Sequence, residues 1–212
     1  MDDFVYTLES FFSQFKLRWY GKHDLILHED DVPNGIYFIK SGFIRMYSLS
    51  KDGEELTRLI LGPHDIFPTR WIFGDENIDY YAEPLTDFEC WHAPKQIFLD
   101  YLAVNPKLYL MLLKYLSNRM NMLYDRLESL AFGDAYQKII AMLLLLVKQF
   151  GIKTLKGTLI TVPLSQKDFG SLIGIVRETV SEEMEQMKRA GFISWENHKI
   201  TITNLQKLAK EI

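Results

Sequence analysis

Short apolar segments alternate with turn signals through the first hundred residues. The apolar segments, rich in Ile, Leu, Tyr, Phe and Thr, cover residues 36–40, 43–49, 55–61 and 88–93. Turn signals lie at Gly21, Asn34-Gly35, Ser41-Gly42, Asp52-Gly53, Gly62-Pro63, Gly74-Asp75 and Glu83-Pro84. Short strands with a turn about every 8–12 residues predict an antiparallel sandwich or small barrel. Asp52-Gly53 predicts a two-residue hairpin turn, and a short helix over residues 8–15 is expected before the strands.

A long helix is predicted over residues 106–132, after a short helix over 95–103. Pro106 suits its first turn, where the N–H that proline lacks would have no partner. Apolar residues recur in alternating steps of four and three at Tyr109, Leu113, Leu116, Met120, Leu123, Leu127 and Leu130. This heptad seam predicts a coiled-coil homodimer; the alternative is that it belongs to the chain's own core. A second stripe can pack on the barrel and consists of Leu108, Met111, Leu112, Tyr115 and Met122.

The last third predicts a winged helix-turn-helix. A helix over 135–150 ends at Gly151, and a strand over 159–163 follows. Ser165 can cap a helix over 166–172, Ile173-Gly174 form the turn, and a second helix covers 176–190. The buried face of this pair is expected to be Phe169, Leu172, Val180, Met184 and Met187. A hairpin over 191–195 and 198–202 forms the wing, before a weak helix over 205–211.

The composition is that of a folded chain, with 212 residues of which 48% are hydrophobic and 25% charged. The longest apolar run, 139–147, is shorter than the roughly 18 residues of a membrane-spanning helix. Because the N-terminus is acidic, we do not expect it to be a signal peptide. A single cysteine, Cys90, excludes an intramolecular disulfide framework, a four-cysteine zinc site and a cysteine-ligated iron–sulfur cluster. We expect the protein to be cytoplasmic.

The charge is unevenly distributed along the chain. Residues 135–212 carry 11 basic and 7 acidic residues, a net +4, which leaves −8 for the other 134 residues of a chain whose total is −4. A basic C-terminal third on an acidic body is typical of an attached nucleic-acid-binding domain, although ordinary surface variation can give the same balance.

No catalytic constellation is found. His28-Glu29 begins like a zinc-protease motif, but Val32 occupies the position of the second histidine ligand. The histidines contain no His-x-His pair for a cupin-type metal site; they are His23, His28, His64, His92 and His198. There is no Gly-x-Ser-x-Gly elbow and no phosphate-binding glycine-rich loop. We therefore expect a protein that is not an enzyme and has no metal site and no identified cofactor.

The second helix of the predicted pair carries side chains that can read DNA. Arg177 can pair with guanine in a bidentate manner, Glu178 can accept from a cytosine amino group, and Thr179 and Ser181 can reach a base or a phosphate. Phosphate contacts are expected from Ser165 and Lys167 at the first helix and from Lys199 in the wing. The alternative is a winged module that contacts proteins.

Three segments resemble the CRP/FNR family, which includes the cyclic-AMP receptor protein and the fumarate–nitrate regulator. Residues 170–181, GSLIGIVRETVS, are similar to its recognition motif; residues 34–42, NGIYFIKSG, and 61–67, LGPHDIF, look like β-roll signatures. The resemblance covers about residues 20–203. It implies an α+β fold with an antiparallel β-roll over 1–105, a dimerisation helix over 106–133 and a winged helix-turn-helix over 134–212.

The chain departs from that family at several places. Members that bind cyclic nucleotides carry Gly-Glu-Leu and, later, Arg-Ser/Thr-Ala, where residues 67–71 here read FPTRW and 80–82 read YYA. Both anchors are absent, so cyclic AMP is not the expected effector. The cysteines of the iron–sulfur oxygen sensor are also absent. Glu182 stands where many members carry an arginine that contacts DNA.

The roll segment over residues 68–82 suggests a pocket for a different effector. Aromatic residues suit a flat or apolar ligand, and a nearby cation can pair with its carboxylate or phosphate. The expected lining is Arg70, Trp71, Tyr80 and Tyr81 from the roll, joined by Phe73, with Leu116 and Met120 from the long helix. The alternative is that the aromatics only fill the roll and Arg70 faces solvent.

The sequence thus predicts a homodimeric, sequence-specific regulator that binds a pseudo-palindromic site in double-stranded DNA and responds to a small molecule. RNA polymerase is a further candidate partner, and no membrane association is expected. The alternative function is a ligand-binding signalling module that acts on a protein partner without contacting DNA.

Overall fold

The computed structural model describes residues 3–74 and 77–211. Asp75 of the predicted turn lies outside the described residues. The chain forms two compact units, Met1–Asn118 and Arg119–Ile212, and the division falls within the long helix α4 (Pro106–Ala131). The prediction of this helix is confirmed, and the predicted segments 1–105, 106–133 and 134–212 remain predictions.

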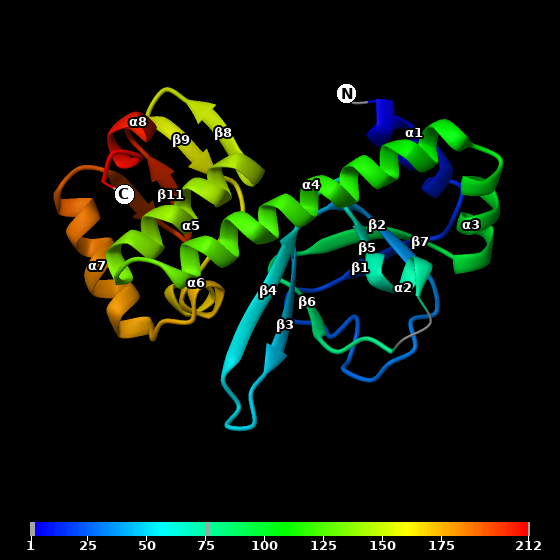
Figure 1. Ribbon diagram of the computed structural model, residues 1–212, viewed down its shortest axis with the longest axis horizontal. Coiled ribbons are helices and arrows are strands. Elements are labelled where there is room, and N and C mark those ends of the chain that lie inside the picture. The colour runs from blue at the N-terminus through cyan, green and yellow to red at the C-terminus, as the bar shows by residue number, and fades with distance from the viewer. Residues whose placement is uncertain (1–2, 75–76, 212) are drawn as a thin grey trace. The chain divides into compact units, whose positions relative to one another are not determined.

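The first unit contains the predicted antiparallel roll (Figure 1). Its elements are α1 (Asp3–Phe12), β1 (Leu17–Tyr20), β2 (Ile36–Ser41), β3 (Ile44–Leu49), β4 (Glu55–Leu61), β5 (Ile66–Phe67), α2 (Thr69–Phe73), β6 (Tyr81–Pro84), β7 (Phe88–Ala93), α3 (Lys95–Ala103) and the beginning of α4. One sheet has the strand order β1-β7-β2-β5 and the other has the order β4-β3-β6. All of their strand pairs are antiparallel.

Strand β2 is buried on both faces because each face meets a different core. Ile36 and Phe38 pack with α1, α3 and the start of α4, whereas Tyr37 and Ile39 lie in the core between the sheets. Side chains alternate across a strand, which explains how neighbouring residues reach opposite cores. Of the second helical stripe, Leu108 and Leu112 are buried in the first core, and Met111 and Tyr115 pack against it, as predicted. Met122 is half-buried and lies beyond Asn118.

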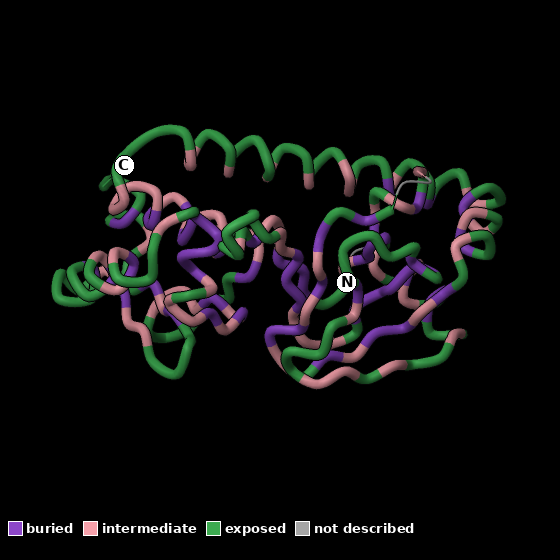
Figure 2. The backbone as a smooth tube through the Cα atoms, turned by 90° about the horizontal axis from the view of Figure 1, so that it is seen from below, coloured by how far each residue is buried: buried purple, intermediate pink, exposed green. Residues whose placement is uncertain are grey.

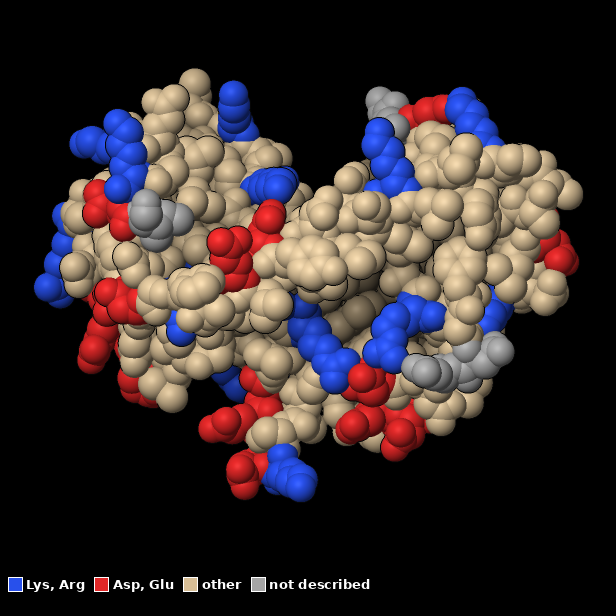
Figure 3. Space-filling view, viewed as in Figure 1, with Lys and Arg blue, Asp and Glu red and all other residues tan. Residues whose placement is uncertain are grey.

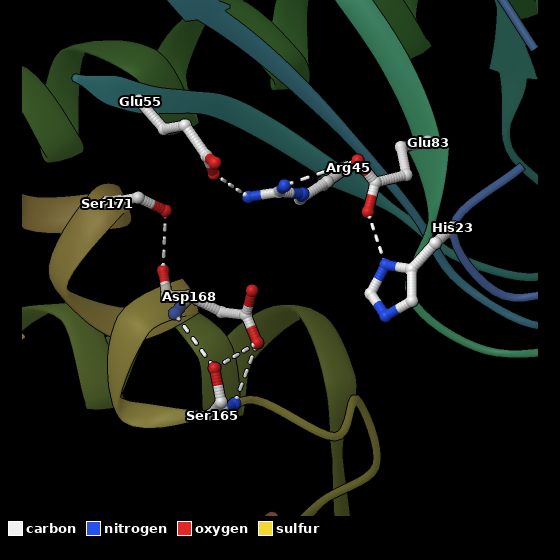
Figure 4. Close-up of polar contacts among 7 residues, drawn as sticks. All are labelled: His23, Arg45, Glu55, Glu83, Ser165, Asp168 and Ser171. Atoms are coloured by element: carbon white, nitrogen blue, oxygen red, sulfur yellow. Dashed lines mark hydrogen bonds and ion pairs between the residues drawn. The ribbon is translucent and has the colours of Figure 1, made fainter. Parts of the chain in front are cut away.

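A buried ion-pair cluster joins three strands of the roll. Nη1 of Arg45 lies 2.6 Å from Oε2 of Glu55, and its Nη2 lies 3.3 Å from Oε2 of Glu83. The ring of Tyr47 covers the guanidinium at 4.4 Å. Glu83 also binds Nδ1 of His23 at 2.6 Å (Figure 4). Sequence reasoning did not find this cluster, because the partners in each of its ion pairs are separated by 10 residues or more.

Four local predictions in this unit need correction. The helix expected over 8–15 is Asp3–Phe12, since Phe4, Leu8, Phe11 and Phe12 already form its buried face. The turn at Asp52-Gly53 belongs to a longer loop over 50–54, with Leu49 paired to Glu55 across it. Phe43 precedes β3, and Glu83-Pro84 ends strand β6 instead of forming a turn. Pro84 is tolerated because β6 is an edge strand.

The second unit is a winged helix-turn-helix. Besides the end of α4 it contains α5 (Ala135–Phe150), β8 (Gly151–Thr154), β9 (Gly157–Ile160), α6 (Gln166–Ile173), α7 (Arg177–Arg189), β10 (Ile193–Glu196), β11 (Lys199–Ile202) and α8 (Leu205–Leu208). The strand order is β10-β11-β9-β8. The helix expected over 135–150 and the wing hairpin are confirmed.

Two elements in this unit end three residues before the predicted position. The strand expected over 159–163 is Gly157–Ile160, because Thr161 N–H already donates to the carbonyl of Phe150 and Pro163 has no N–H to give. The final helix, expected over 205–211, is α8 alone, which Asn204 caps by accepting from the N–H of Lys207.

Folding of the roll should depend on pH through His92. Its Nδ1 lies 3.1 Å from Nη2 of Arg18, which can only donate, so this nitrogen carries no proton. Burial, reinforced by the charge of Arg18, lowers the pKa of His92 from 6.5 to about 4. Below pH 6.5 the unfolded chain binds a proton that the folded chain does not, so the free energy of unfolding should fall as the pH drops from 6.5 to about 4. Urea titrations should show a smaller fall for His92→Gln, and equal falls would contradict the assignment.

Candidate DNA-binding surface

Helix α6 begins at a capping box formed by Ser165 and Asp168. Oγ of Ser165 accepts from the N–H of Asp168 at 3.1 Å, and the Asp168 carboxylate accepts from the N–H of Ser165 at 2.9 Å (Figure 4). The two bonds satisfy donors that the first turn of a helix leaves unpaired. The predicted cap is therefore confirmed.

Two glycines set the turn between α6 and α7. Gly174 ends α6 with φ of +68°, a left-handed conformation that costs glycine little. At Gly170 a Cβ atom would lie 2.6 Å from the carbonyl oxygen of Ile175, so only glycine allows the turn to pack this closely on α6. The predicted buried face is confirmed; it consists of Phe169, Leu172, Val180, Met184 and Met187.

The residues of α7 that are predicted to contact DNA differ in their exposure to solvent. Arg177 and Glu178, in the first turn, are exposed. Thr179 and Ser181 are half-buried, which corrects the expectation that all four lie on the exposed face. Arg177 and Glu178 are therefore the side chains best placed to reach a base edge.

The helix pair and the wing enclose a hollow of about 410 Å³. It is lined by Ser165, Gln166, Lys167, Arg177, Trp195, Asn197 and His198. The hollow brings three of the predicted contacts together: Ser165, Lys167 and Arg177. Sequence reasoning missed Gln166 and the wing residues Trp195, Asn197 and His198. The predicted turn of the wing could have pointed to Asn197 and His198, which lie at that turn. Lys199 is exposed at the start of β11 and does not line the hollow.

Charge on this unit is mixed. Figure 3 shows basic and acidic side chains interspersed on the visible face of the second unit. On α7 itself Glu178, Glu182 and Glu185 are exposed, and Glu185 lies 3.6 Å from Lys188. The net positive charge therefore does not gather on α7, and lysines outside it must supply much of the attraction to phosphate.

The long helix is bound to the helix-turn-helix within the second unit. Nη2 of Arg126 on α4 donates to the carbonyl of Leu172 at 2.6 Å. This carbonyl belongs to the last turn of α6, whose carbonyls lack helical partners. Burial lowers the pKa of Arg126. The contact joins α4 to the element that precedes the turn.

The predicted dimer seam is mostly exposed in the single chain. Tyr109, Leu113, Met120, Leu123 and Leu127 are exposed, the last by 64% (Figure 2). Leu130 is half-buried, and Leu116 packs against the first core. An exposed row of large apolar side chains on one helix face is what a second helix would cover.

The proposed effector residues are only partly brought together. Arg70, Trp71 and Tyr80 border a cavity of about 30 Å³, far below the roughly 300 Å³ of a typical ligand pocket. Arg70 is largely exposed and lies 3.1 Å from Asp79. Tyr81 does not line this cavity and stacks on Tyr47, with ring centroids 5.3 Å apart.

The other residues of this predicted pocket lie elsewhere. Phe73 is exposed beside Tyr109, with ring centroids 6.3 Å apart. Leu116 belongs to the first core, and Met120 lies beyond Asn118, in the second unit. The effector pocket therefore remains a prediction.

In residues 3–74 and 77–211, no helix is both long and apolar enough to cross a bilayer. Within the same described residues, no three His, Cys, Asp or Glu side chains are grouped so that they could hold a metal ion.

Two family models match the chain. Residues 17–105 match the cyclic nucleotide-binding domain, and residues 137–211 match the Crp-like helix-turn-helix domain. The chain is 26% identical to the global nitrogen regulator of a Nostoc species over 194 residues, which cover 91% of this chain and 87% of that protein. It is 25% identical to the CRP-like cAMP-activated global transcriptional regulator of Mycobacterium tuberculosis over 185 residues, covering 87% and 83%.

Solved structures share the fold. A mutant of CooA from Carboxydothermus hydrogenoformans superposes with a TM-score of 0.78 at 22% identity, covering 95% of this chain and 89% of that one. A transcriptional regulator of the CRP/FNR family from Thermus thermophilus gives a TM-score of 0.72 at 23% identity, covering 92% and 97%. A roll, a long helix and a winged helix-turn-helix thus occur in the same order in proteins of distant sequence.

Proposed function

Because the chain belongs to the CRP/FNR family of transcriptional regulators, we propose that it binds a pseudo-palindromic DNA site as a homodimer. The observation that carries this proposal is the exposed first turn of α7, where Arg177 and Glu178 are both exposed and Arg177 lines the hollow that α6 and the wing enclose. A helix presented in this way fits a major groove about 12 Å wide.

The contacts divide into two kinds. Arg177 and Glu178 read base edges, and Thr179 and Ser181 on the same helix reach a base or a phosphate. Ser165, Lys167 and Lys199 bind backbone phosphates and set the position of the helix in the groove. Phosphate contacts add affinity for every sequence, whereas the base contacts distinguish one site from another.

The dimer forms through α4. Covering the exposed seam with a second copy removes large apolar side chains from water and places two recognition helices side by side. Half-sites then lie about 34 Å apart, one turn of the double helix. A small molecule other than cyclic AMP favours one of two states of this dimer, with Arg70 and Trp71 as candidate contacts. Access to DNA requires the protein to act in the cytoplasm, where RNA polymerase is a candidate partner.

The test is selection of DNA from a pool of random duplexes by the full-length protein, with and without a small-molecule extract of the source cells. The expected result is enrichment of a two-fold symmetric motif with half-site centres about 10 base pairs apart. If neither arm enriches a motif, the proposal fails and the alternative, a signalling module that binds a protein, is favoured.

Cyclic AMP should not stabilise the protein. The segments that would grip its ribose and phosphate read FPTRW at 67–71 and YYA at 80–82, and Arg70 is paired with Asp79. A ligand at 100 times its dissociation constant adds about 2.7 kcal/mol to the free energy of unfolding. Thermal melts with millimolar cyclic AMP should show no shift. A shift that Arg70→Ala abolishes would show instead that Arg70 binds the cyclic phosphate.

A further inference from the structure

Gln166 bridges the two helices of the helix-turn-helix. It is the first residue of α6 and is half-buried, with its amide facing α7. Nε2 of Gln166 donates to Oγ of Ser181 at 3.1 Å, and Oε1 accepts from Nε of Arg177 at 3.5 Å. One side chain thus contacts two residues that we expect at the DNA surface, one in each of the first two turns of α7.

The orientation of this amide follows from its neighbours. Arg177 can only donate, so the oxygen of Gln166 must face it and the amide nitrogen must face Ser181. A serine hydroxyl can accept that hydrogen bond. Only one of the two amide orientations therefore satisfies both partners, and the chain has no need of a third group to fix it.

The bond to Arg177 leaves its reading end available. Gln166 takes the Nε–H, whereas a bidentate pair with guanine O6 and N7 uses two N–H groups of the guanidinium, such as those on Nη1 and Nη2. A free arginine loses side-chain entropy when it binds a base. A partner that already holds the Nε reduces this loss before DNA arrives.

We propose that Gln166 is a positioning residue that orients Arg177 for its base contact, without reading a base itself. This inference rests on the proposed function, since it requires Arg177 to contact DNA. It makes the base contact of Arg177 depend on a second residue, Gln166 on the neighbouring helix, whose amide is anchored by Ser181.

The test uses the full-length protein and the motif that the wild type selects from random duplexes. The base pair read by Arg177 is identified as the one whose preference Arg177→Ala abolishes. Gln166→Met keeps the length of the side chain and removes both hydrogen bonds. It should reduce the preference at that same base pair by about 3- to 10-fold and leave the salt dependence of binding unchanged. In the Arg177→Ala background, Gln166→Met should change nothing further at that position.

A conservative variant separates positioning from folding. Gln166→Glu keeps an oxygen to accept from Arg177, so it should restore the preference, at a lower overall affinity because of its negative charge. Circular dichroism and melting temperature verify that each variant is folded. Loss of preference at a different base pair, or additive effects in the double variant, would show that Gln166 contacts DNA itself and would overturn the inference. An unchanged preference in folded Gln166→Met would also overturn it, while failure of the wild type to select any motif would instead reject the proposed function.

Discussion

Light scattering should find monomers when Leu123 is replaced by glutamate. In a coiled coil the seam residues of two copies face one another, so Leu123→Glu places two like charges in an apolar interface. An uncompensated buried charge costs about 3–5 kcal/mol, which weakens the dimer by more than about 100-fold. Since Leu123 is 49% exposed in the single chain, the substitution should leave the fold of each copy intact.

A neighbouring position on the same helix provides the control. Asn121 is exposed and lies two residues before Leu123, about 160° around the helix from it. Asn121→Glu adds the same charge away from the seam and should stay dimeric. If Leu123→Glu is still a dimer at micromolar concentration, the seam is not the interface, and the exposed row of α4 must have another partner.

The rhythm of apolar segments and turns predicted most of the roll. β2, β4 and β7 follow the expected segments closely, because at least one face of each strand packs against a hydrophobic core. β1 was missed since none of its residues is buried, and Trp19 on its exposed face is 64% exposed. β5, with two residues, is too short to give a period. In each case the missing information lies in the strand's neighbours and not in its own residues.

The candidate site was predictable where its residues act locally. The cap at Ser165 and a turn at Gly174 depend on a few consecutive residues, and both were predicted from them. Gln166 was not found, because its contacts with Arg177 and Ser181 cross 11 and 15 residues of chain. They form only when α6 packs on α7. The Arg45 cluster of the roll was missed for the same reason.

Removing the side chain of Arg177 should weaken binding to the selected site and relax its specificity at one base pair of each half-site. A lost bidentate contact with guanine costs about 1–3 kcal/mol, or about 5- to 150-fold in affinity per half-site. Fluorescence anisotropy with the selected duplex and with duplexes changed at single positions measures both effects. The loss should be seen only on duplexes that keep the preferred base, because Arg177→Ala can no longer gain affinity from that base.

Lys167→Ala separates this base contact from attraction to phosphate. Lys167 is exposed beside Arg177 in the hollow, and we expect it to bind the DNA backbone. Its removal should weaken binding to every duplex alike and reduce the slope of log affinity against log salt by about 0.9 per subunit, since one fewer phosphate is neutralised. Arg177→Ala should instead change the ranking of duplexes more than the slope. If both variants lower affinity equally for all sequences, Arg177 binds phosphate as Lys167 does, and the bases must be read by Glu178 or by residues further along α7.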